Sequence, residues 1–359
     1  MNKKKIVLTG GGTAGHILPN IALAPYLEKE AFELLYIGSH SSMDEDLVKS
    51  MSHLPFKGIS CGKLRRYFDL RNFVDVFFII QGLLQAFFIL RSTKPALVFA
   101  KGGFVSVPVV WASYLLKIPA LLHESDISPG LANRLMIPFA KYICLSFPQS
   151  QNLVPRTKAR LTGIPVRSFL LQGDAQKGRD LCGFDTSKPI LMVMGGSQGS
   201  QVIDTFTRDH LDELLKHYQV LHLARKQQDE SSHPHRKGYH SFEFVKEELG
   251  HLYACADIII SRSGANTLFE ILHLKKPALL IPLSKNVSRG EQISNAKAFQ
   301  ELSCGEILEQ EDLRLEKVLK LCQKLYENKK DYIFHMTKWS ELNAAEKIVD
   351  IVRELTAKK

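Results

Sequence analysis

The chain has 359 residues, of which 45% are hydrophobic and 23% are charged. This composition excludes a wholly disordered chain, and the length predicts two domains of ordinary size. The six cysteines form no CxxC pair, so they predict free thiols in a reducing compartment and not a disulfide framework or a zinc finger. The net charge of +10 is concentrated in residues 1–160, which carry 19 Lys and Arg against 10 Asp and Glu, whereas the remainder carries 28 against 27. Such an excess suits a nucleic acid, an anionic membrane or a phosphate-bearing substrate.

Short apolar runs alternate with helix-length segments through both halves of the chain. The first residues, MNKKKIVLTG, lack the apolar stretch of a signal peptide and predict a strand instead. Strands are expected at residues 5–10, 33–38, 95–101, 119–124, 141–146, 189–195, 219–224, 257–263 and 277–283. This alternation predicts an α/β fold with parallel sheets covered by helices on both faces. The pattern breaks at residues 159–169 and then restarts, and the last segment, from about residue 343 to 355, is expected to be a helix that packs on either half.

The first expected strand runs into a glycine-rich turn, GGGTAGHILP, at residues 10–19. A strand that ends in glycines before a helix presents free N–H groups and the positive end of a helix dipole, where phosphates bind. Gly10, Gly12 and Gly15 match the dinucleotide fingerprint, but the second strand ends in Gly38-Ser39-His40 without the carboxylate that a ribose requires. NAD and FAD are therefore disfavoured, and no Walker sequence is present. A phosphate-binding turn and a merely tight turn remain the alternatives here.

The second half repeats this arrangement twice. LMVMGGSQGS, at residues 191–200, is a second strand followed by glycines, and SRSGANTLFE, at residues 261–270, opens another helix with Ser263 and Gly264. Glu270 is placed to accept hydrogen bonds from both hydroxyls of a ribose, although a solvated helix glutamate is the alternative. The repetition predicts two similar α/β halves, each with an anion-binding turn.

Residues 73–90 form an apolar stretch long enough for a transmembrane helix. Asp75, Gln81, Gly82 and Gln85 interrupt it, and it lies between strands of one sheet, so a buried crossover helix is predicted. Its phenylalanines exceed what one inward stripe needs, and a basic segment with exposed aromatic residues precedes it. Because no nucleic-acid-binding module accompanies them, an anionic membrane surface is favoured over nucleic acid as the partner. The residues proposed for this contact are Arg65, Arg66, Phe73, Phe77 and Phe78.

Eight stretches together carry a resemblance to a known family: GGTAGHILP, KGGFVSVP, HESDISPGLANR, GIPVR, GGSQGS, EFV, SRSGANTLFE and EQISNA. In these, taken in this order, the chain resembles the MurG family of glycosyltransferases, which complete the lipid-linked disaccharide precursor of peptidoglycan. The resemblance implies the GT-B fold, two Rossmann-like parallel-sheet domains facing a cleft. The implied domains are an acceptor- and membrane-binding domain, residues 1–163, joined by a C-terminal helix at about 343–359, and a donor-binding domain, residues 164–342.

The resemblance also implies an activity. It is the inverting transfer of N-acetylglucosamine (GlcNAc) from UDP-GlcNAc to lipid I, the undecaprenyl-diphospho-muramoyl-pentapeptide, which yields lipid II for peptidoglycan synthesis. No catalytic metal or other cofactor is expected. A peripheral location on the cytoplasmic face of the cell membrane is implied, with cell-wall and division proteins as candidate partners.

Matching motifs imply a donor site mainly in the second domain, where the backbone of Val245 would hold the uracil and Glu270 the ribose. The acceptor diphosphate would lie near the first glycine turn, beside His16. The full donor-binding set implied in this way is Thr13, Ala14, Gly15, Asp126, Arg167, Ser197, Val245, Ser263, Gly264, Ala265, Asn266, Thr267, Leu268, Glu270, Glu291 and Gln292.

The chemistry requires a base for the acceptor hydroxyl and stabilisation of the departing UDP. His16 has a suitable intrinsic pKa, while Glu124 and Asp126 are the competing bases, with His123 as a residue that orients them. Helix N–H groups and Arg167 suit the charge that grows on the leaving group.

The sequence departs from the family pattern at three positions. Ala14 stands where the family often has glycine, Asp126 where it has asparagine, and Glu291 where it has glutamine. The last two changes leave the donor preference open. The one Asp-x-Asp, residues 44–46, follows two serines and is interpreted as the first turn of a helix and not as a metal site.

Two other functions remain open at this point. One is a related lipid glycosyltransferase that uses UDP-glucose or UDP-galactose on diacylglycerol. The other is a non-catalytic nucleotide-sugar sensor at the membrane.

Overall fold

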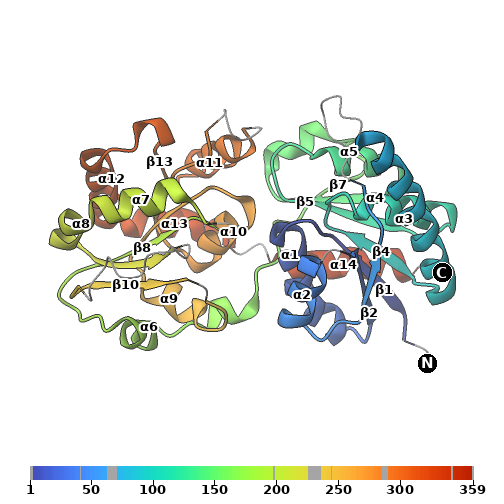
Figure 1. The fold of residues 1–359 in the computed structure, drawn as a ribbon, viewed down its shortest axis with the longest axis horizontal. Helices are drawn as coiled ribbons and strands as arrows, with labels where there is room; N and C mark the ends of the chain where they lie inside the picture. Colours follow the sequence, from blue (N-terminus) through green and yellow to red (C-terminus); the bar gives the residue numbers. More distant parts are fainter. Residues whose placement is uncertain are drawn as a thin grey trace. The chain divides into compact units, whose positions relative to one another are not determined.

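The computed structural model describes residues 3–40, 42–62, 71–196, 199–224, 236–243, 245–284, 290–340 and 343–357, without the side chains of residues 42, 71–74 and 76. The chain divides into two compact units (Figure 1). The first comprises residues 1–167 and 342–359, and the second comprises residues 168–341.

The first unit is built on a parallel sheet of seven strands in the order β3-β2-β1-β4-β5-β6-β7. The strands are β1 (Lys5–Thr9), β2 (Glu33–Ser39), β3 (Phe56–Ile59), β4 (Leu97–Ala100), β5 (Ala120–Glu124), β6 (Tyr142–Leu145) and β7 (Ala159–Leu161). Its helices are α1 (Ala14–Lys29), α2 (Ser42–Met51), α3 (Arg71–Thr93), α4 (Ser106–Leu115), α5 (Leu131–Met136) and α14 (Ala344–Ala357), with short 3-10 helices η1 (Ile137–Phe139) and η2 (Pro148–Leu153).

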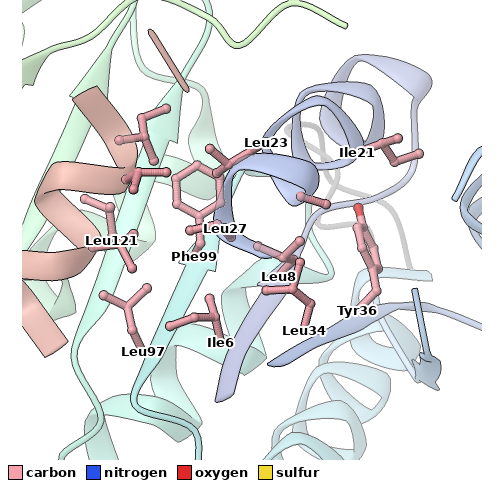
Figure 2. Packing of buried hydrophobic residues seen from close by; sticks show 14 of the residues in the cluster. Ile6, Leu8, Ile21, Leu23, Leu27, Leu34, Tyr36, Leu97, Phe99 and Leu121 are labelled. Atoms are coloured by element: carbon pink, nitrogen blue, oxygen red, sulfur yellow. The ribbon is translucent and has the colours of Figure 1, made fainter. Parts of the chain in front are cut away.

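Both faces of this sheet are buried, because successive side chains of a strand point to opposite sides. In β1, Ile6 and Leu8 belong to the core that includes α1 and α14 (Figure 2). Val7, between them, belongs to the core that α3 and α4 cover on the other face. The C-terminal helix α14 thus completes the core of the first unit through Ile348 and Val352, both fully buried.

The second unit is built on a parallel sheet of six strands in the order β10-β9-β8-β11-β12-β13. The strands are β8 (Ile190–Met194), β9 (Gln219–Leu223), β10 (Tyr239–Phe242), β11 (Ile258–Ser261), β12 (Ala278–Leu280) and β13 (Gly305–Ile307). Its helices are α6 (Ala175–Cys182), α7 (Gln201–Asp209), α8 (Leu211–His217), α9 (Leu249–Cys255), α10 (Ala265–Leu274), α11 (Glu291–Glu301), α12 (Leu315–Glu327) and α13 (Lys329–Ser340), with 3-10 helices η3 (Ser168–Gln172) and η5 (Gln310–Asp312). The predicted α/β class with two parallel sheets is confirmed.

All nine predicted strands are present, but the sequence prediction missed four others. These are β3, β7, β10 and β13, which are the two edge strands of each sheet. The break expected at residues 159–169 begins too early, because β7 occupies residues 159–161 and completes the first sheet.

The apolar stretch at residues 73–90 lies within α3, as the crossover-helix prediction required. Ala86 and Leu90 are fully buried against the sheet, whereas the side chains of Phe77 and Phe88 are each 65% exposed. Among the helices that the structure describes, none is both long and apolar enough to cross a membrane.

Candidate active site

The first glycine-rich loop connects β1 to α1, and close packing explains its glycines. A Cβ atom on Gly11 would lie 2.0 Å from a carboxylate oxygen of Asp44. A Cβ atom on Gly103, in the loop after β4, would lie 2.3 Å from the carbonyl oxygen of Gly11, and Gly103 also has φ of +80°. The two loops therefore approach each other backbone to backbone, which only glycine permits.

Asp44 anchors this loop through hydrogen bonds to its side-chain carboxylate. Its carboxylate is fully buried and accepts hydrogen bonds from the main-chain N–H of Gly12 (2.9 Å), the N–H of Ser39 (3.0 Å) and the hydroxyl of Ser39 (2.6 Å). Asp44 lies in the first turn of α2, so the interpretation of the Asp-x-Asp as a helix start is confirmed. Within the part of the chain that the structure describes, no group of three or more His, Cys, Asp or Glu side chains is arranged to hold a metal ion.

His16 lies in the first turn of α1 and is anchored on one side of its ring. Its Nδ1 is 3.1 Å from the carbonyl oxygen of Gly11 and 3.1 Å from the hydroxyl oxygen of Thr13. Because a carbonyl only accepts, Nδ1 carries the proton, and the lone pair is on Nε2. Burial and the positive charge of Lys101 lower the pKa of His16 to about 4, so its ring is neutral near pH 7. A neutral imidazole, with a lone pair on its unprotonated nitrogen, is the form that can accept a proton.

Glu124, at the end of β5, has both carboxylate oxygens occupied by donors of its own unit. It accepts from the N–H of Asp126 (3.1 Å), the N–H of Gly130 (2.9 Å) and the side-chain amide of Asn133 (2.8 Å). Burial, followed by the neighbouring charge of Asp126, raises the pKa of Glu124. These contacts favour a role in holding the turn after β5 over the role of a base.

Asp126 is half-buried in that turn. His123, on β5, makes its hydrogen bond to a different part of the first unit. His123 is fully buried, and its Nε2 donates to the carbonyl oxygen of Gly163 (2.8 Å). The expectation that His123 orients the two acidic residues is therefore wrong, because its hydrogen bond connects β5 to the segment after β7.

In the second unit, an arginine that the sequence analysis passed over joins the loops at the carboxyl end of the sheet. Arg262 is buried, and its Nε donates to the hydroxyl of Ser200 (3.1 Å), the N-cap residue of α7. The rest of its guanidinium donates to the carbonyl oxygens of Ile281 (3.0 Å) and Pro282 (3.1 Å) and to the side chain of Gln310 (2.7 Å). These four hydrogen bonds from one rigid plane fix Ser200, at the start of α7, relative to the segment after β12 and to η5.

The helix α10 begins at Ala265, after the N-cap Gly264, as the sequence predicted. The first intrahelical hydrogen bond runs from the N–H of Leu268 to the carbonyl oxygen of Gly264 (3.0 Å). The helix therefore presents its first amides, at Ala265, Asn266 and Thr267, at its N-terminal end. The side chain of Leu268 is fully buried, and its N–H is used within the helix.

Glu270 follows on α10 and is positioned by a tyrosine from α9. The hydroxyl of the fully buried Tyr253 lies 3.3 Å from a carboxylate oxygen of Glu270 and 3.4 Å from the sulfur of Met194. Val245 is half-buried. Ser263 is buried, and its hydroxyl donates to the carbonyl oxygen of Gln292 (2.8 Å) at the start of α11.

The side chain of Gln292 turns toward its own unit, since its Oε1 accepts from the N–H of Leu283 (3.2 Å). Glu291, beside it, is half-buried. The start of α11 is therefore tied to the start of α10, and the second unit brings together the residues expected at 263–270 and 291–292.

The predicted residues thus fall into two sets. The first unit holds Thr13, Ala14, Gly15, His16, Glu124 and Asp126, together with the half-buried Arg167. The remaining donor residues are in the second unit. Ser197, Arg65 and Arg66 lie outside the described residues, as does the side chain of Phe73.

The sequence analysis missed four residues that hold or act on the candidate site residues. Three of them lie in motifs that the sequence analysis had identified: Asp44 in the Asp-x-Asp, Lys101 in KGG and Arg262 in SRSGAN. No sequence motif pointed to Tyr253, because its role depends on its hydrogen bond to Glu270 on α10.

Comparison with known proteins identifies the family to which the chain belongs. Residues 6–145 match the glycosyltransferase family 28 N-terminal domain, and residues 190–352 match the family 28 C-terminal domain. The UDP-N-acetylglucosamine–N-acetylmuramyl-(pentapeptide) pyrophosphoryl-undecaprenol N-acetylglucosamine transferase of Clostridium tetani is 45% identical over 98% of this chain and 98% of its own. The chain belongs to the MurG family.

Other members of the MurG family agree with this assignment. The protein of the same name from Geobacillus kaustophilus is 45% identical over 98% of this chain and 99% of its own length. The crystal structure of MurG from Acinetobacter baumannii shares the fold, with a TM-score of 0.72, 24% identity and coverage of 98% of this chain and 100% of that one.

Proposed function

We propose that the chain transfers GlcNAc from UDP-GlcNAc to lipid I, forming lipid II and UDP. The observation that carries this proposal is the 45% identity, over nearly the whole of both chains, to a relative named for that transfer. The alternatives, a diacylglycerol glycosyltransferase and a non-catalytic sensor, have no comparable support.

The second unit is the donor side in this proposal. The amides at the start of α10, at residues 265–267, are the proposed contacts of the diphosphate, and Ser197, which lies outside the described residues, is assigned to it by its motif alone. Glu270 accepts from the ribose hydroxyls, and Tyr253 keeps its carboxylate in place. The backbone of Val245 holds the uracil, while Glu291 and Gln292 approach the sugar. Arg167, which belongs to the first unit, is assigned to add positive charge for the departing UDP, whose charge grows in the transition state.

The first unit is the acceptor side in this proposal, and Thr13 to Gly15 and Asp126 are the residues of this unit assigned to donor binding. His16 is the base for the acceptor hydroxyl, since its ring is neutral and the hydrogen bond of Nδ1 leaves Nε2 to accept the proton. Glu124 holds the turn that carries Asp126.

Turnover tests this proposal directly. Purified protein is incubated with radiolabelled UDP-GlcNAc, UDP-glucose or UDP-galactose and with a lipid I analogue or diacylglycerol. Label from UDP-GlcNAc is expected in the lipid I product, at a rate that EDTA does not change because helix amides stabilise the leaving group. Turnover on diacylglycerol alone, or binding without turnover on any acceptor, refutes it.

The chain is also proposed to rest on the cytoplasmic face of an anionic membrane through an apolar patch of the first unit. The described part of the patch is made of large exposed side chains on α3, the end of α4 and η1: Phe77, Phe78, Ile80, Leu84, Phe88, Tyr114, Leu115 and Phe139. Phe77, Ile80, Leu84 and Phe88 recur every three to four residues, so they share one face of α3. Exposed Arg91 and Lys117 lie close to the patch in sequence and suit anionic headgroups.

Vesicle binding tests this surface. Replacing Phe77 and Phe88 by serine is expected to weaken binding to vesicles that contain anionic lipid at least tenfold, because about 1.5–3 kcal/mol of burial is lost per side chain. The matched control is Phe334→Ser, which changes a phenylalanine of the second unit that is 60% exposed. Equal binding of the double variant and the control contradicts the proposal.

A further inference from the structure

Lys101, whose charge lowers the pKa of His16, is a buried lysine at the carboxyl end of β4. Its side chain is 1% exposed. Its main-chain N–H donates to the carbonyl oxygen of Thr9 (2.9 Å), at the end of β1, and its Nζ donates to the hydroxyl of Ser125, in the turn after β5. Burying an ammonium group is costly unless it is paired, so its position needs an explanation.

The surroundings of Lys101 are the acceptor-side residues of the first unit. Glu124 and Asp126, around Ser125, face its ammonium with negative charge. The residue after it, Gly102, lies against the ring of His16, since a Cβ atom there would be 3.5 Å from Cδ2 of the imidazole. Lys101 therefore lies between the loop that carries His16 and the turn that carries Asp126.

We propose that Lys101 is a positioning residue for the transfer reaction, and that its buried ammonium holds the turn at 124–126 and places a positive charge near the His16 loop. The hydrogen bond of the ammonium to Ser125 fixes the turn. The main-chain bond to Thr9 extends the pairing of β4 with β1, so it places Lys101 beside the glycine loop whatever its side chain. The positive charge offsets the two acidic groups of the turn and acts on His16 from the side of β4.

This placement has a measurable electrical consequence. The groups that act on His16 are Lys101, which lowers its pKa, and Asp44 of α2, which raises it. Lys101 is itself faced by Glu124 and Asp126 of β5 and its turn, and by the thiol of Cys144 on β6. Burial lowers the pKa of Lys101 to about 8, so its charge predominates at pH 7. Removing that charge takes away one of the two causes that keep His16 neutral.

The test compares Lys101→Met with Lys101→Arg in the full-length protein. The imidazole of His16 is titrated by NMR, with His16→Gln used to assign its signal, and thermal melting checks the fold. Lys276→Met is the matched control, since Lys276 is a lysine of the second unit whose ammonium is held by the carbonyl oxygens of Ala254 and Ala256, and burial lowers its pKa as well.

In Lys101→Met the pKa of His16 is expected to rise by about one pH unit or more, as for the loss of one neighbouring charge. Lys101→Arg should keep it near the wild-type value, and Lys276→Met should leave it unchanged. An unchanged His16 titration in folded Lys101→Met overturns the proposal. If Lys101→Met does not fold, Lys101→Gln replaces it with the same expectation.

The kinetic part of the inference rests on the proposed function. The acid limb of kcat/KM is expected to move to higher pH in Lys101→Met by the amount that NMR measures. Wild-type protein without turnover on lipid I refutes the proposed function while leaving the NMR result valid, so the two failures are distinguishable. A shifted His16 pKa with an unmoved acid limb overturns the assignment of Lys101 to the reaction.

Discussion

Replacing Asp44 by asparagine tests how the first glycine loop is held. The substitution keeps the size of the side chain but exchanges one of two acceptor oxygens for a donor. One oxygen of Asp44 accepts from Gly12, and the other accepts twice from Ser39. An amide group can serve only one of these sides, so the main-chain N–H of either Gly12 or Ser39 faces another donor.

The magnitude follows from these contacts. An unpaired buried donor costs about 1–3 kcal/mol, and hydrogen bonds to a charged acceptor contribute about 1.5–3 kcal/mol each. We expect Asp44→Asn to lower the free energy of unfolding of the first unit by about 2–4 kcal/mol, or its melting temperature by about 5–15 °C. Turnover should fall as well, because the loop carries Thr13 and His16.

The control lies in the same Asp-x-Asp. Asp46 is exposed, so Asp46→Asn should change the free energy of unfolding by no more than about 0.5 kcal/mol. Calorimetry of both variants gives the comparison. Equal melting temperatures for Asp44→Asn and Asp46→Asn would show that the carboxylate does not support the loop.

Two further predictions concern the donor side and pH. Tyr253→Phe removes the hydrogen-bond donor to Glu270 and is expected to raise KM for UDP-GlcNAc about three- to tenfold with little change in kcat. The control, Tyr142→Phe, loses a surface hydrogen bond to Glu354 and should leave both constants unchanged. An unaltered KM in Tyr253→Phe contradicts the role of Tyr253 in positioning Glu270. The folded chain should lose stability as the pH falls from about 6.5 to about 4, because the pKa of His16 is about 4 when folded against an ordinary 6.5, so the unfolded chain binds the proton first. Denaturant titrations across this range should show a shallower pH dependence for His16→Gln, and an identical slope contradicts the assignment.

The interior strands were predictable from sequence, and the edge strands were not. A central strand of a parallel sheet is buried on both faces, so it is a continuous apolar run, as in IVL of β1 or III of β11. The edge strands β3, β7 and β10 are largely half-exposed, and β13 has only three residues. Their sequences therefore carry no run that distinguishes them from loops.

The helix starts were predictable because they depend on local sequence. The helices α1, α7 and α10 each begin just after the glycines that were expected to precede a helix. Asp44 and Tyr253 could not be assigned in this way, because each acts on a residue at least 17 positions away that the fold alone brings near. The burial of Leu268 was not evident from its motif either, since a residue near a helix start can face the core.

A crystal structure of the protein with UDP-GlcNAc tests the central claim most directly. The account predicts the diphosphate on the amides at the start of α10, the ribose hydroxyls on Glu270 and the uracil on the backbone of Val245. A nucleotide bound at the glycine loop of the first unit, with these groups of the second unit making no contact, would contradict it.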